Sequence, residues 1–375
     1  MADDKLTKLI DRLRLEQIRP SGYSKNIRNL SGLIDSLNEL HIMIGHTQLK
    51  QSIADQTAYV IKMMNHGMIA NVMLNTVIYG PPGVGKTSIG RILAKIWNNL
   101  GYLKSTPTTL ISDSKAKKLV DDQLSIIFIV IGVAYYIYLV MIGNDKKVPI
   151  SKRLGIFISI ALIILGLIYM FKTSSSITYT SVSKSENDIV IVSRPDFIGQ
   201  YMGFTEKNTM NILEKSRGKV LFIDEAYTLV TDDRDSYGKE ALDIINRYLS
   251  EHPNELVVIM AGYREQMDKL FTIQPGLERR FMWYFECSGY NGNELFDILQ
   301  LHLKRHGWKI DDNDVEAVKK LINDNVNIFH NYGGDMEKLS FFSQLSNANN
   351  THDGLILTID DFKKGLIKFK QNMQI

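Results

Sequence analysis

Short apolar runs alternate with amphipathic segments along most of the chain. Four runs have the length and the bounding residues of buried strands: 75–79, 188–192, 219–223 and 256–263. Between them, apolar residues recur at helical spacing over 88–97, 205–215 and 240–251. Strands that alternate with helices are typical of a parallel sheet with helices on its faces. The pattern therefore predicts an α/β fold.

The pattern becomes wholly helical from Asn291 onward. Asn291 and Glu294 have the spacing of a capping box at the start of a helix. Three further helices are expected over 315–322, 335–345 and 360–369. We expect a small helical domain over 289–375 that has no chemistry of its own.

Residues 1–36 are polar and helix-prone. A loose amphipathic pattern runs from Asp3 to Gln17 and ends at the Arg-Pro-Ser-Gly sequence of 19–22. The pattern fits a helical arm that binds a partner, and it also fits a surface helix packed on the next domain. A second helix is expected to begin near Thr47.

Two uncharged blocks interrupt this alternation inside an insertion over 105–187. They cover 123–144 and 154–171, and each would be roughly 27 Å long or more as a helix. That length is enough to cross a thin bilayer. Neither block has the polar stripe of a helix that packs in a water-soluble domain. The pattern favours a membrane hairpin over a pair of buried core helices.

A hairpin of two spans returns the chain to the side from which it left. We expect the rest of the protein on the cytoplasmic side of a multi-pass membrane anchor. Basic residues do not decide the orientation, since they occur in the link between the blocks and in both flanks. A re-entrant hairpin that does not fully cross stays open as an alternative.

Composition narrows the class of protein only a little. The chain has 375 residues, enough for two or three domains, and its net charge is +3. A charge this small argues against a dedicated nucleic-acid binder. The single cysteine, Cys287, excludes an internal disulfide and fits a reducing compartment. The charged first 17 residues do not have the pattern of a signal peptide.

The most specific motif is the glycine-rich sequence 80–87, which fits G-x-x-x-x-G-K-[ST]. It follows a predicted strand and precedes a predicted helix, so free N–H groups and the helix dipole would face a bound phosphate. Lys86 is expected to reach the β- and γ-phosphates of ATP, and Thr87 to hold Mg²⁺. The expected nucleotide-binding residues here are Gly80, Pro81, Pro82, Gly83, Val84, Gly85, Lys86, Thr87 and Ser88.

A second motif places two acids at the end of a predicted strand. Asp224 and Glu225 follow the apolar run 219–223. The carboxyl ends of parallel strands meet at one edge of a sheet, so both acids should lie beside the phosphate loop. Asp224 is expected to bind Mg²⁺, and Glu225 to orient and polarise the attacking water.

Two adjacent arginines, Arg279 and Arg280, follow a Pro-Gly turn at 275–276. This arrangement suits a positively charged finger that reaches the γ-phosphate bound by a neighbouring subunit. It equally suits a solvated basic corner of the surface.

The order of these parts resembles the AAA+ ATPases, and in particular the branch of red-type rubisco activases and sporulation ATPases. The resemblance covers roughly 37–104 and 188–345. Its motifs are GPPGVGKT (80–87), IGQYMGFT (198–205), VLFIDEAYTL (220–229), VVIMAGY (257–263) and QPGLERRF (274–281). It implies an αβα ATPase domain over 37–104 and 188–288, followed by a helical lid over 289–375.

The resemblance also implies roles that spacing alone does not. Ile44 and Gly45 match the segment that contacts adenine, and Tyr201 matches the pore-loop aromatic that grips a polypeptide. Arg280 matches the arginine finger, with Arg279 as the second choice. Because such fingers act in trans, the resemblance implies a homo-oligomeric ring, usually a hexamer.

The chain departs from the family pattern at the second nucleotide sensor and in its insertion over 105–187, whereas the first sensor lacks its usual polar residue as this branch generally does. The strand that ends at Tyr263 has no Asn or Thr at the first sensor position. At the second sensor position, where the family has Arg, this chain has Glu337, with Lys338 beside it.

The sequence therefore predicts a membrane-anchored AAA+ ring motor that hydrolyses ATP with Mg²⁺ and remodels or threads a protein. The alternative is a nucleotide-gated assembly scaffold at a membrane that threads nothing. A nucleic-acid motor is disfavoured by the balanced charge.

Overall fold

A computed structural model describes most of the chain outside the insertion. The described residues are 4–69, 72–103, 189–199, 201, 203–232, 234–348 and 354–373. The two apolar blocks predicted to form a membrane hairpin, 123–144 and 154–171, lie outside them. Among the helices of the described residues, none combines the length and the apolar character needed to span a bilayer.

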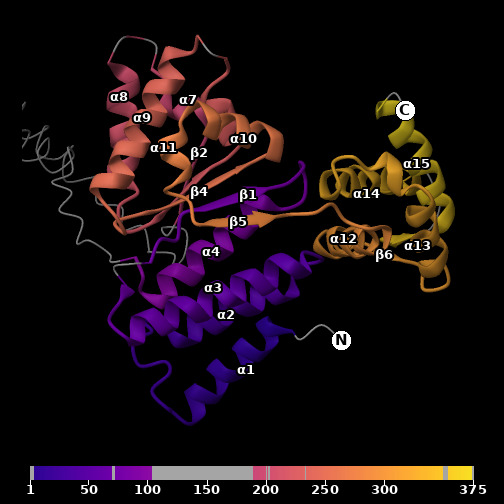
Figure 1. Ribbon diagram of the computed structural model, residues 1–375. Coiled ribbons are helices and arrows are strands. Elements are labelled where there is room, and N and C mark those ends of the chain that lie inside the picture. The colour runs from indigo at the N-terminus through magenta and orange to yellow at the C-terminus, as the bar shows by residue number, and fades with distance from the viewer. Residues whose placement is uncertain are drawn as a thin grey trace, which may run out of the picture. The chain divides into compact units, whose positions relative to one another are not determined.

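The centre of the larger domain is a five-stranded parallel sheet (Figure 1). Its strands are β1 (Thr76–Tyr79), β2 (Ile189–Val192), β3 (Val220–Ile223), β4 (Val257–Gly262) and β5 (Trp283–Glu286). They lie in the order β2-β3-β4-β1-β5, and every neighbouring pair is parallel. The predicted α/β class with a parallel sheet is confirmed. Strands β1, β3 and β4 are buried throughout, as expected for apolar runs covered on both faces.

The edge strand β5 was not predicted from the sequence. The strand is short, and its side chains differ in burial: Phe285 is buried, whereas Tyr284 and Glu286 are exposed. A four-residue edge strand with outward polar and aromatic side chains gives a weak periodic signal. Its position beside β1 is fixed by tertiary pairing, with Thr76 opposite Trp283.

Four helices from the first hundred residues cover one face of the sheet (Figure 1). They are α1 (Lys5–Ile18), α2 (Leu30–Ile42), α3 (Thr47–Asn65) and α4 (Lys86–Leu100). Helix α1 contacts α2 and α3 and buries Leu6 and Leu13 completely in the same core cluster. The first helix is therefore packed into the larger domain.

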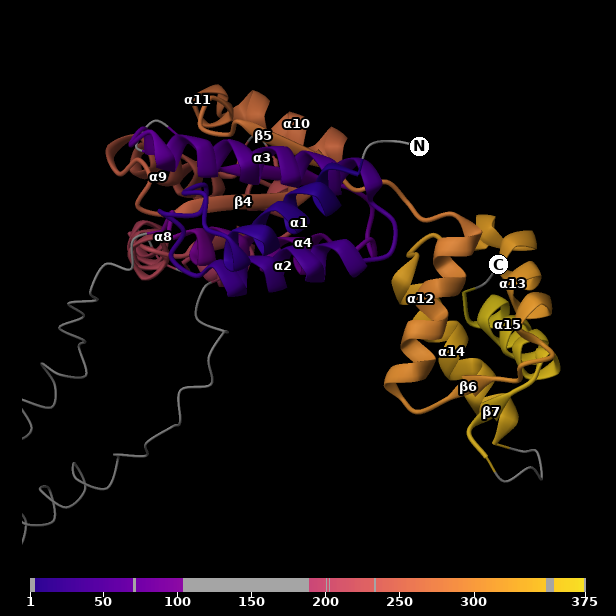
Figure 2. The same cartoon turned by 90° about the horizontal axis from the view of Figure 1, so that it is seen from below.

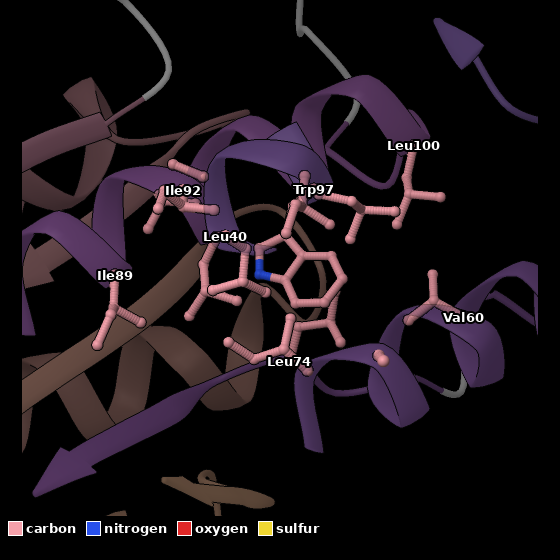
Figure 3. Packing of buried hydrophobic residues seen from close by; sticks show 14 of the residues in the cluster. Leu40, Val60, Leu74, Ile89, Ile92, Trp97 and Leu100 are labelled. Carbon is pink, nitrogen blue, oxygen red and sulfur yellow. The ribbon is translucent and has the colours of Figure 1, made fainter. Parts of the chain in front are cut away.

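Helix α4 is the helix that follows the glycine-rich motif, and it lies against the centre of the sheet. Trp97 is completely buried between Leu40, Leu74 and neighbouring residues of α4 (Figure 3). Gly90 is needed for this close approach, since a Cβ there would lie 2.4 Å from the ring of Phe222 on β3. This packing holds the start of α4 firmly beside the ends of β1 and β3.

The other face is covered by elements that follow β2. They are α7 (Arg194–Phe197), α8 (Phe204–Lys215), the 3-10 helix η2 (Ala226–Leu229), α9 (Ser236–Glu251), α10 (Arg264–Ile273) and α11 (Pro275–Glu278). The alternate strand residues point to this side, so Leu221 and Ile223 pack here while Phe222 packs on the α4 side.

The C-terminal part forms a helical lid with its own core (Figure 2). Its elements are α12 (Gly292–Arg305), β6 (Lys309–Ile310), α13 (Val315–Asp324), the 3-10 helix η3 (Val326–Ile328), α14 (Gly333–Asn347), β7 (Ile356–Leu357) and α15 (Ile359–Met373). The predicted capping box at Asn291 and Glu294 is confirmed, because each side chain accepts a hydrogen bond from the other residue's backbone N–H. The small parallel sheet of β6 and β7 was not predicted.

The chain leaves the described domain after Leu103 and re-enters it at Ile189. Tyr102, just before the exit, donates a hydrogen bond to the carbonyl of Val72, which precedes β1. Ile189 is the first residue of β2. Both points lie at the amino ends of the parallel strands, which is the edge of the sheet opposite the glycine-rich motif.

Candidate functional site

The loop from Gly80 to Gly85 joins β1 to α4 and wraps around the start of the helix. Gly83 has a φ of 74°, in the left-handed region that favours glycine. A Cβ at Gly83 would also lie 1.9 Å from the carbonyl oxygen of Asn331 in the lid. No side chain in the described structure caps the N-terminus of α4, so the first N–H groups of the helix remain available to an anion.

Lys86 is held at the mouth of this loop. Its side chain is only 6% exposed, and its Nζ donates hydrogen bonds to the carbonyl oxygens of Gly80 at 2.9 Å and Pro81 at 3.0 Å. The same Nζ lies 3.6 Å from Oε1 of Glu225. Lys86 and Glu225, which were predicted to share one site, are therefore in contact.

Thr87 and Asp224 are also in contact. The hydroxyl of Thr87 donates to Oδ2 of Asp224 at 3.2 Å, and Oδ1 of Asp224 accepts from the backbone N–H of Glu225 at 3.1 Å. One hydroxyl and one carboxylate, side by side next to a phosphate loop, fit Mg²⁺, which prefers oxygen ligands and takes only one or two from the protein. The described residues hold no cluster of three or more metal-ligating His, Cys, Asp or Glu side chains.

Glu225 occupies an unusual backbone position directly after β3. Its φ of 47° is left-handed, which costs a non-glycine residue of the order of 1–3 kcal/mol. Its Oε2 is buried and has no hydrogen-bond partner within the described part of the chain. A strained acid with one unused oxygen beside the phosphate loop is suited to accept a proton from a bound water.

The adenine-contacting segment predicted at Ile44 and Gly45 lies at the junction of α2, α3 and the lid. Ile44 packs against the lid core. Gly45 has a φ of 69°, and a Cβ there would lie 2.9 Å from Oε1 of Glu294 on α12. A cavity of about 400 Å³ adjoins this junction and is lined by residues 46–49, Glu286, Ser288, Gly289, Asn291 and Glu294.

His46 is a residue at this junction that the sequence reasoning missed. Its Nε2 lies 2.9 Å from the carbonyl oxygen of Val84 and 2.8 Å from the hydroxyl of Tyr290. Burial lowers the pKa of His46 below its ordinary value, although the hydrogen bond to Val84 works in the other direction. His46 therefore ties the phosphate loop to the segment that leads into the lid. Its position directly after Gly45 was the available signal.

The start of α14 also touches the phosphate loop. The backbone N–H of Gly333 donates to the carbonyl of Gly83 at 3.2 Å. Asp335 is completely buried and accepts a hydrogen bond from the N–H of Asn331 at 2.7 Å. Lid contact with the loop is therefore made by backbone atoms that Asp335 holds in place.

Glu337, at the second sensor position, does not take part in that contact. It is exposed on α14. Burial lowers the pKa of His302 on α12, and Glu337 partly offsets this by raising it. Glu337 is thus associated electrostatically with α12.

Arg279 and Arg280 lie at the opposite edge of the sheet from Lys86. They follow α11 and precede β5, and the carbonyl of Arg280 accepts a hydrogen bond at 3.0 Å from Asn75, which precedes β1. Arg279 is exposed, whereas Nε of Arg280 is buried and has no partner among the described residues. The fold does not bring either arginine to the phosphate loop of its own chain.

Tyr201 lies in the segment between α7 and α8, beyond the carboxyl end of β2. Its side chain is 67% exposed, and its ring lies 5.7 Å from that of Phe204. Tyr201 is therefore free to contact another molecule.

Comparison with known proteins agrees with this arrangement. Residues 173–286 match the model of the ATPase family associated with various cellular activities (AAA). The chain is 29% identical over 361 residues to the putative cfxQ-like protein R730 of Acanthamoeba polyphaga mimivirus, covering 93% of this chain and 68% of that protein.

Two bacterial relatives align over a shorter part. CbbX of Cereibacter sphaeroides is 40% identical over 111 residues, which are 29% of this chain and 36% of CbbX. Stage V sporulation protein K of Bacillus subtilis is 34% identical over 126 residues, 34% of this chain and 39% of that protein. The chain thus matches less than half the length of these two relatives. Over these residues the chain is similar to AAA ATPases of the branch that includes CbbX, CfxQ and stage V sporulation protein K.

Proposed function

We propose that this protein hydrolyses ATP with Mg²⁺ in a ring of identical subunits and uses the energy to remodel or thread a protein at a membrane. The observation that carries the catalytic part is the meeting of Thr87 with Asp224 and of Lys86 with Glu225 at one edge of the sheet. Residues from two motifs that are distant in the sequence therefore lie at one place. Together they supply a phosphate-binding loop, two oxygen ligands for a cation and a general base.

Each group of residues has its own proposed role in ATP binding and hydrolysis. The loop 80–88 and the N–H groups of α4 surround the phosphates, and Lys86 turns from the loop carbonyls to the β- and γ-phosphates. Thr87 and Asp224 hold Mg²⁺, which neutralises phosphate charge when it is bound. Glu225 orients the attacking water and accepts its proton. Ile44 and Gly45 contact adenine.

We propose that Arg280 completes the site of a neighbouring subunit, with Arg279 as the second choice. Each strand between the two edges has four to six residues, so the arginines lie roughly 13 Å or more from the phosphate loop along the sheet. This separation supports action in trans and hence an oligomer, which AAA proteins commonly form. By resemblance to the family, the oligomer is a hexameric ring.

Tyr201 is the proposed gripping residue for a polypeptide in the centre of that ring. Its high exposure supports this role. A second function, a nucleotide-gated scaffold at the membrane that threads nothing, is favoured by Glu337. A carboxylate at that lid position does not supply the positive charge with which a lid would sense the γ-phosphate.

We propose that the insertion anchors the ring through spans at 123–144 and 154–171, with the ATPase domain on the cytoplasmic side. The proposal rests on the composition of these blocks. The exit after Leu103 and the return at Ile189 support it, because both lie at the amino edge of the sheet and the phosphate loop lies at the opposite edge.

Three variants of the full chain test the motor. Glu225→Gln and Arg280→Ala should each reduce ATP hydrolysis sharply, while Tyr201→Ala should retain hydrolysis and lose remodelling. If Tyr201→Ala leaves the biological effect intact, the scaffold replaces the motor. Membrane fractionation with protease protection, on the full chain and on a variant lacking 105–187, tests the anchor. A full chain found entirely outside the membrane fraction ends the anchor proposal.

A further inference from the structure

Asn75 joins the start of the central strand β1 to the segment that carries the two arginines. It directly precedes β1 and is only 8% exposed. Its Nδ2 donates a hydrogen bond to the carbonyl oxygen of Arg280 at 3.0 Å. The backbone carbonyl of Asn75 accepts a second hydrogen bond, at 3.3 Å, from the N–H of Met282. One buried residue therefore holds the chain on both sides of Phe281.

The amide oxygen of Asn75 is bound to the centre of the sheet. Oδ1 accepts a hydrogen bond at 2.9 Å from the N–H of Val258, which lies in the buried strand β4. The N–H of Val258 needs an acceptor and the carbonyl of Arg280 needs a donor, so the amide fits in one orientation only. Because β4 pairs with both β1 and β3, it is an interior strand of the sheet. Asn75 therefore fixes the Arg280 carbonyl relative to a rigid element.

The placement of Arg280 depends on its backbone. Nε of Arg280 is buried and has no hydrogen-bond partner among the described residues. The backbone N–H of Arg280 donates to the carbonyl of Leu277 at 2.9 Å, and the next residue, Phe281, is buried in the core. The Asn75 amide adds the bond to the carbonyl of Arg280 itself. A group that must reach a reacting phosphate has to be held to within about 0.5 Å, and such supporting contacts supply that precision.

We propose that Asn75 is a positioning residue for the arginine finger, and that its amide sets the backbone of Arg280 so that the guanidinium reaches the γ-phosphate bound by the neighbouring subunit. The inference rests on the proposed function, in which Arg280 acts in trans. It assigns Asn75 to the neighbour's site, although Asn75 begins the strand that leads into the phosphate loop of its own chain. Asn75 itself touches no phosphate and transfers no proton.

A purely structural role for Asn75 would act on the other site. β1 runs from Thr76 to Tyr79, and the phosphate loop follows at Gly80. If Asn75 only supported β1, its loss would impair the nucleotide site of its own chain and leave the finger intact. The two roles therefore differ in which of two adjacent subunits carries the defect.

The first test is ATP binding and steady-state ATP hydrolysis by the full chain with Asn75→Asp. This variant keeps an oxygen for the N–H of Val258 and replaces the donor that faces Arg280 by an acceptor. We expect ATP binding close to that of wild type and a kcat at least roughly ten-fold lower, as for a misplaced catalytic group. Asn75→Ala removes both hydrogen bonds without burying a charge and should give the same result.

Thr76→Val is the matched control. Thr76 is completely buried at the same end of β1, and its hydroxyl donates to the carbonyl of Leu74 at 2.7 Å instead of to the arginine segment. The variant removes one hydrogen bond of a similar kind and keeps the shape of the side chain. It should leave kcat and ATP binding close to wild type.

Mixed rings locate the defect. Subunits with Asn75→Asp keep Lys86 and Glu225, so mixing them with Glu225→Gln subunits, whose finger is intact, should restore part of the hydrolysis. Mixing them with Arg280→Ala subunits should restore nothing, because neither subunit then supplies a positioned finger. A role limited to the chain's own loop gives the reverse pattern, with recovery beside Arg280→Ala and none beside Glu225→Gln.

The outcomes separate this inference from the proposed function. Wild-type kcat in both Asn75 variants, or recovery of either variant beside Arg280→Ala, overturns the inference and leaves the proposed function in place. A mixture of Arg280→Ala with Glu225→Gln that does not recover, or a wild-type chain that does not hydrolyse ATP, overturns the proposed function and the inference with it.

Discussion

The hydroxyl of Thr87 lies 3.2 Å from Oδ2 of Asp224, although the two residues are 137 positions apart in the sequence. This hydrogen bond joins the first residues of α4 to the end of β3. It places both predicted Mg²⁺ ligands next to the phosphate loop. The contributions of their two oxygens should be separable by substitution.

Replacing Thr87 should change the dependence of hydrolysis on Mg²⁺. Thr87→Ala removes one oxygen ligand and should raise the Mg²⁺ concentration for half-maximal ATP hydrolysis by roughly ten-fold, the size of one lost charge-assisted contact. Thr87→Ser keeps the hydroxyl and should stay close to wild type. Titration of hydrolysis with Mg²⁺ measures both. Equal Mg²⁺ dependence in all three proteins would remove Thr87 from the cation site.

Mixed rings test whether Arg280 acts in trans. Subunits with Arg280→Ala keep an intact Lys86 and Glu225, and subunits with Glu225→Gln keep an intact Arg280. Each variant alone should be nearly inactive. Mixing them should restore part of the ATP hydrolysis, because an intact arginine then completes an intact site on its neighbour. Replacing Arg280→Ala by Arg279→Ala in the mixture decides between the two arginines. Absence of recovery in both mixtures would contradict action between subunits.

Arg194 and Asp235 form the most buried ion pair near the Glu225 segment. Their side chains are 25% and 6% exposed, and the Arg194 guanidinium also donates to the carbonyl of Thr228 on η2. Arg194→Ala would leave Asp235 buried without its cation and should cost about 3–5 kcal/mol of stability. Lys5→Ala, which breaks the exposed pair of Lys5 and Asp55, should cost less than about 1 kcal/mol. Urea unfolding of both variants measures the difference, and equal costs would contradict the account.

The same ion pair predicts a pH dependence. Burial acts to raise the pKa of Asp235, but hydrogen bonds from Arg194 and from the N–H groups of Gly238 and Thr231 hold it well below its usual range. A depressed native pKa contributes stability that is complete above the pKa of an unfolded aspartate, about 4, and is lost as the pH falls through the native pKa. The stability gap between wild type and Asp235→Asn should therefore shrink when unfolding is measured at pH 3 rather than pH 7. A gap that does not change with pH would refute this assignment.

The local motifs made much of the site predictable. Gly80–Thr87 is contiguous, and its role follows from backbone geometry that the sequence itself dictates. The meeting of Thr87 and Asp224 was predictable as well, because the carboxyl ends of parallel strands share an edge. The placement of Arg280 at the other edge needed β5, whose four residues gave too little periodicity to be recognised.

The lid contacts were not predictable. His46 and Tyr290 are 244 residues apart and carry no motif, and Gly333 reaches Gly83 through backbone atoms that any sequence could supply. Such contacts depend on how two separately folded units meet.

The central claim is that Glu225 is the base of an ATP-hydrolysing site built on the loop 80–87. The most direct measurement is ATP binding and ATP hydrolysis by the full chain with Glu225→Gln, in the presence of Mg²⁺. We predict that the variant binds ATP about as well as wild type while its kcat falls by at least about 100-fold, the usual contribution of a positioned general base. Hydrolysis by Glu225→Gln at the wild-type rate would contradict the claim.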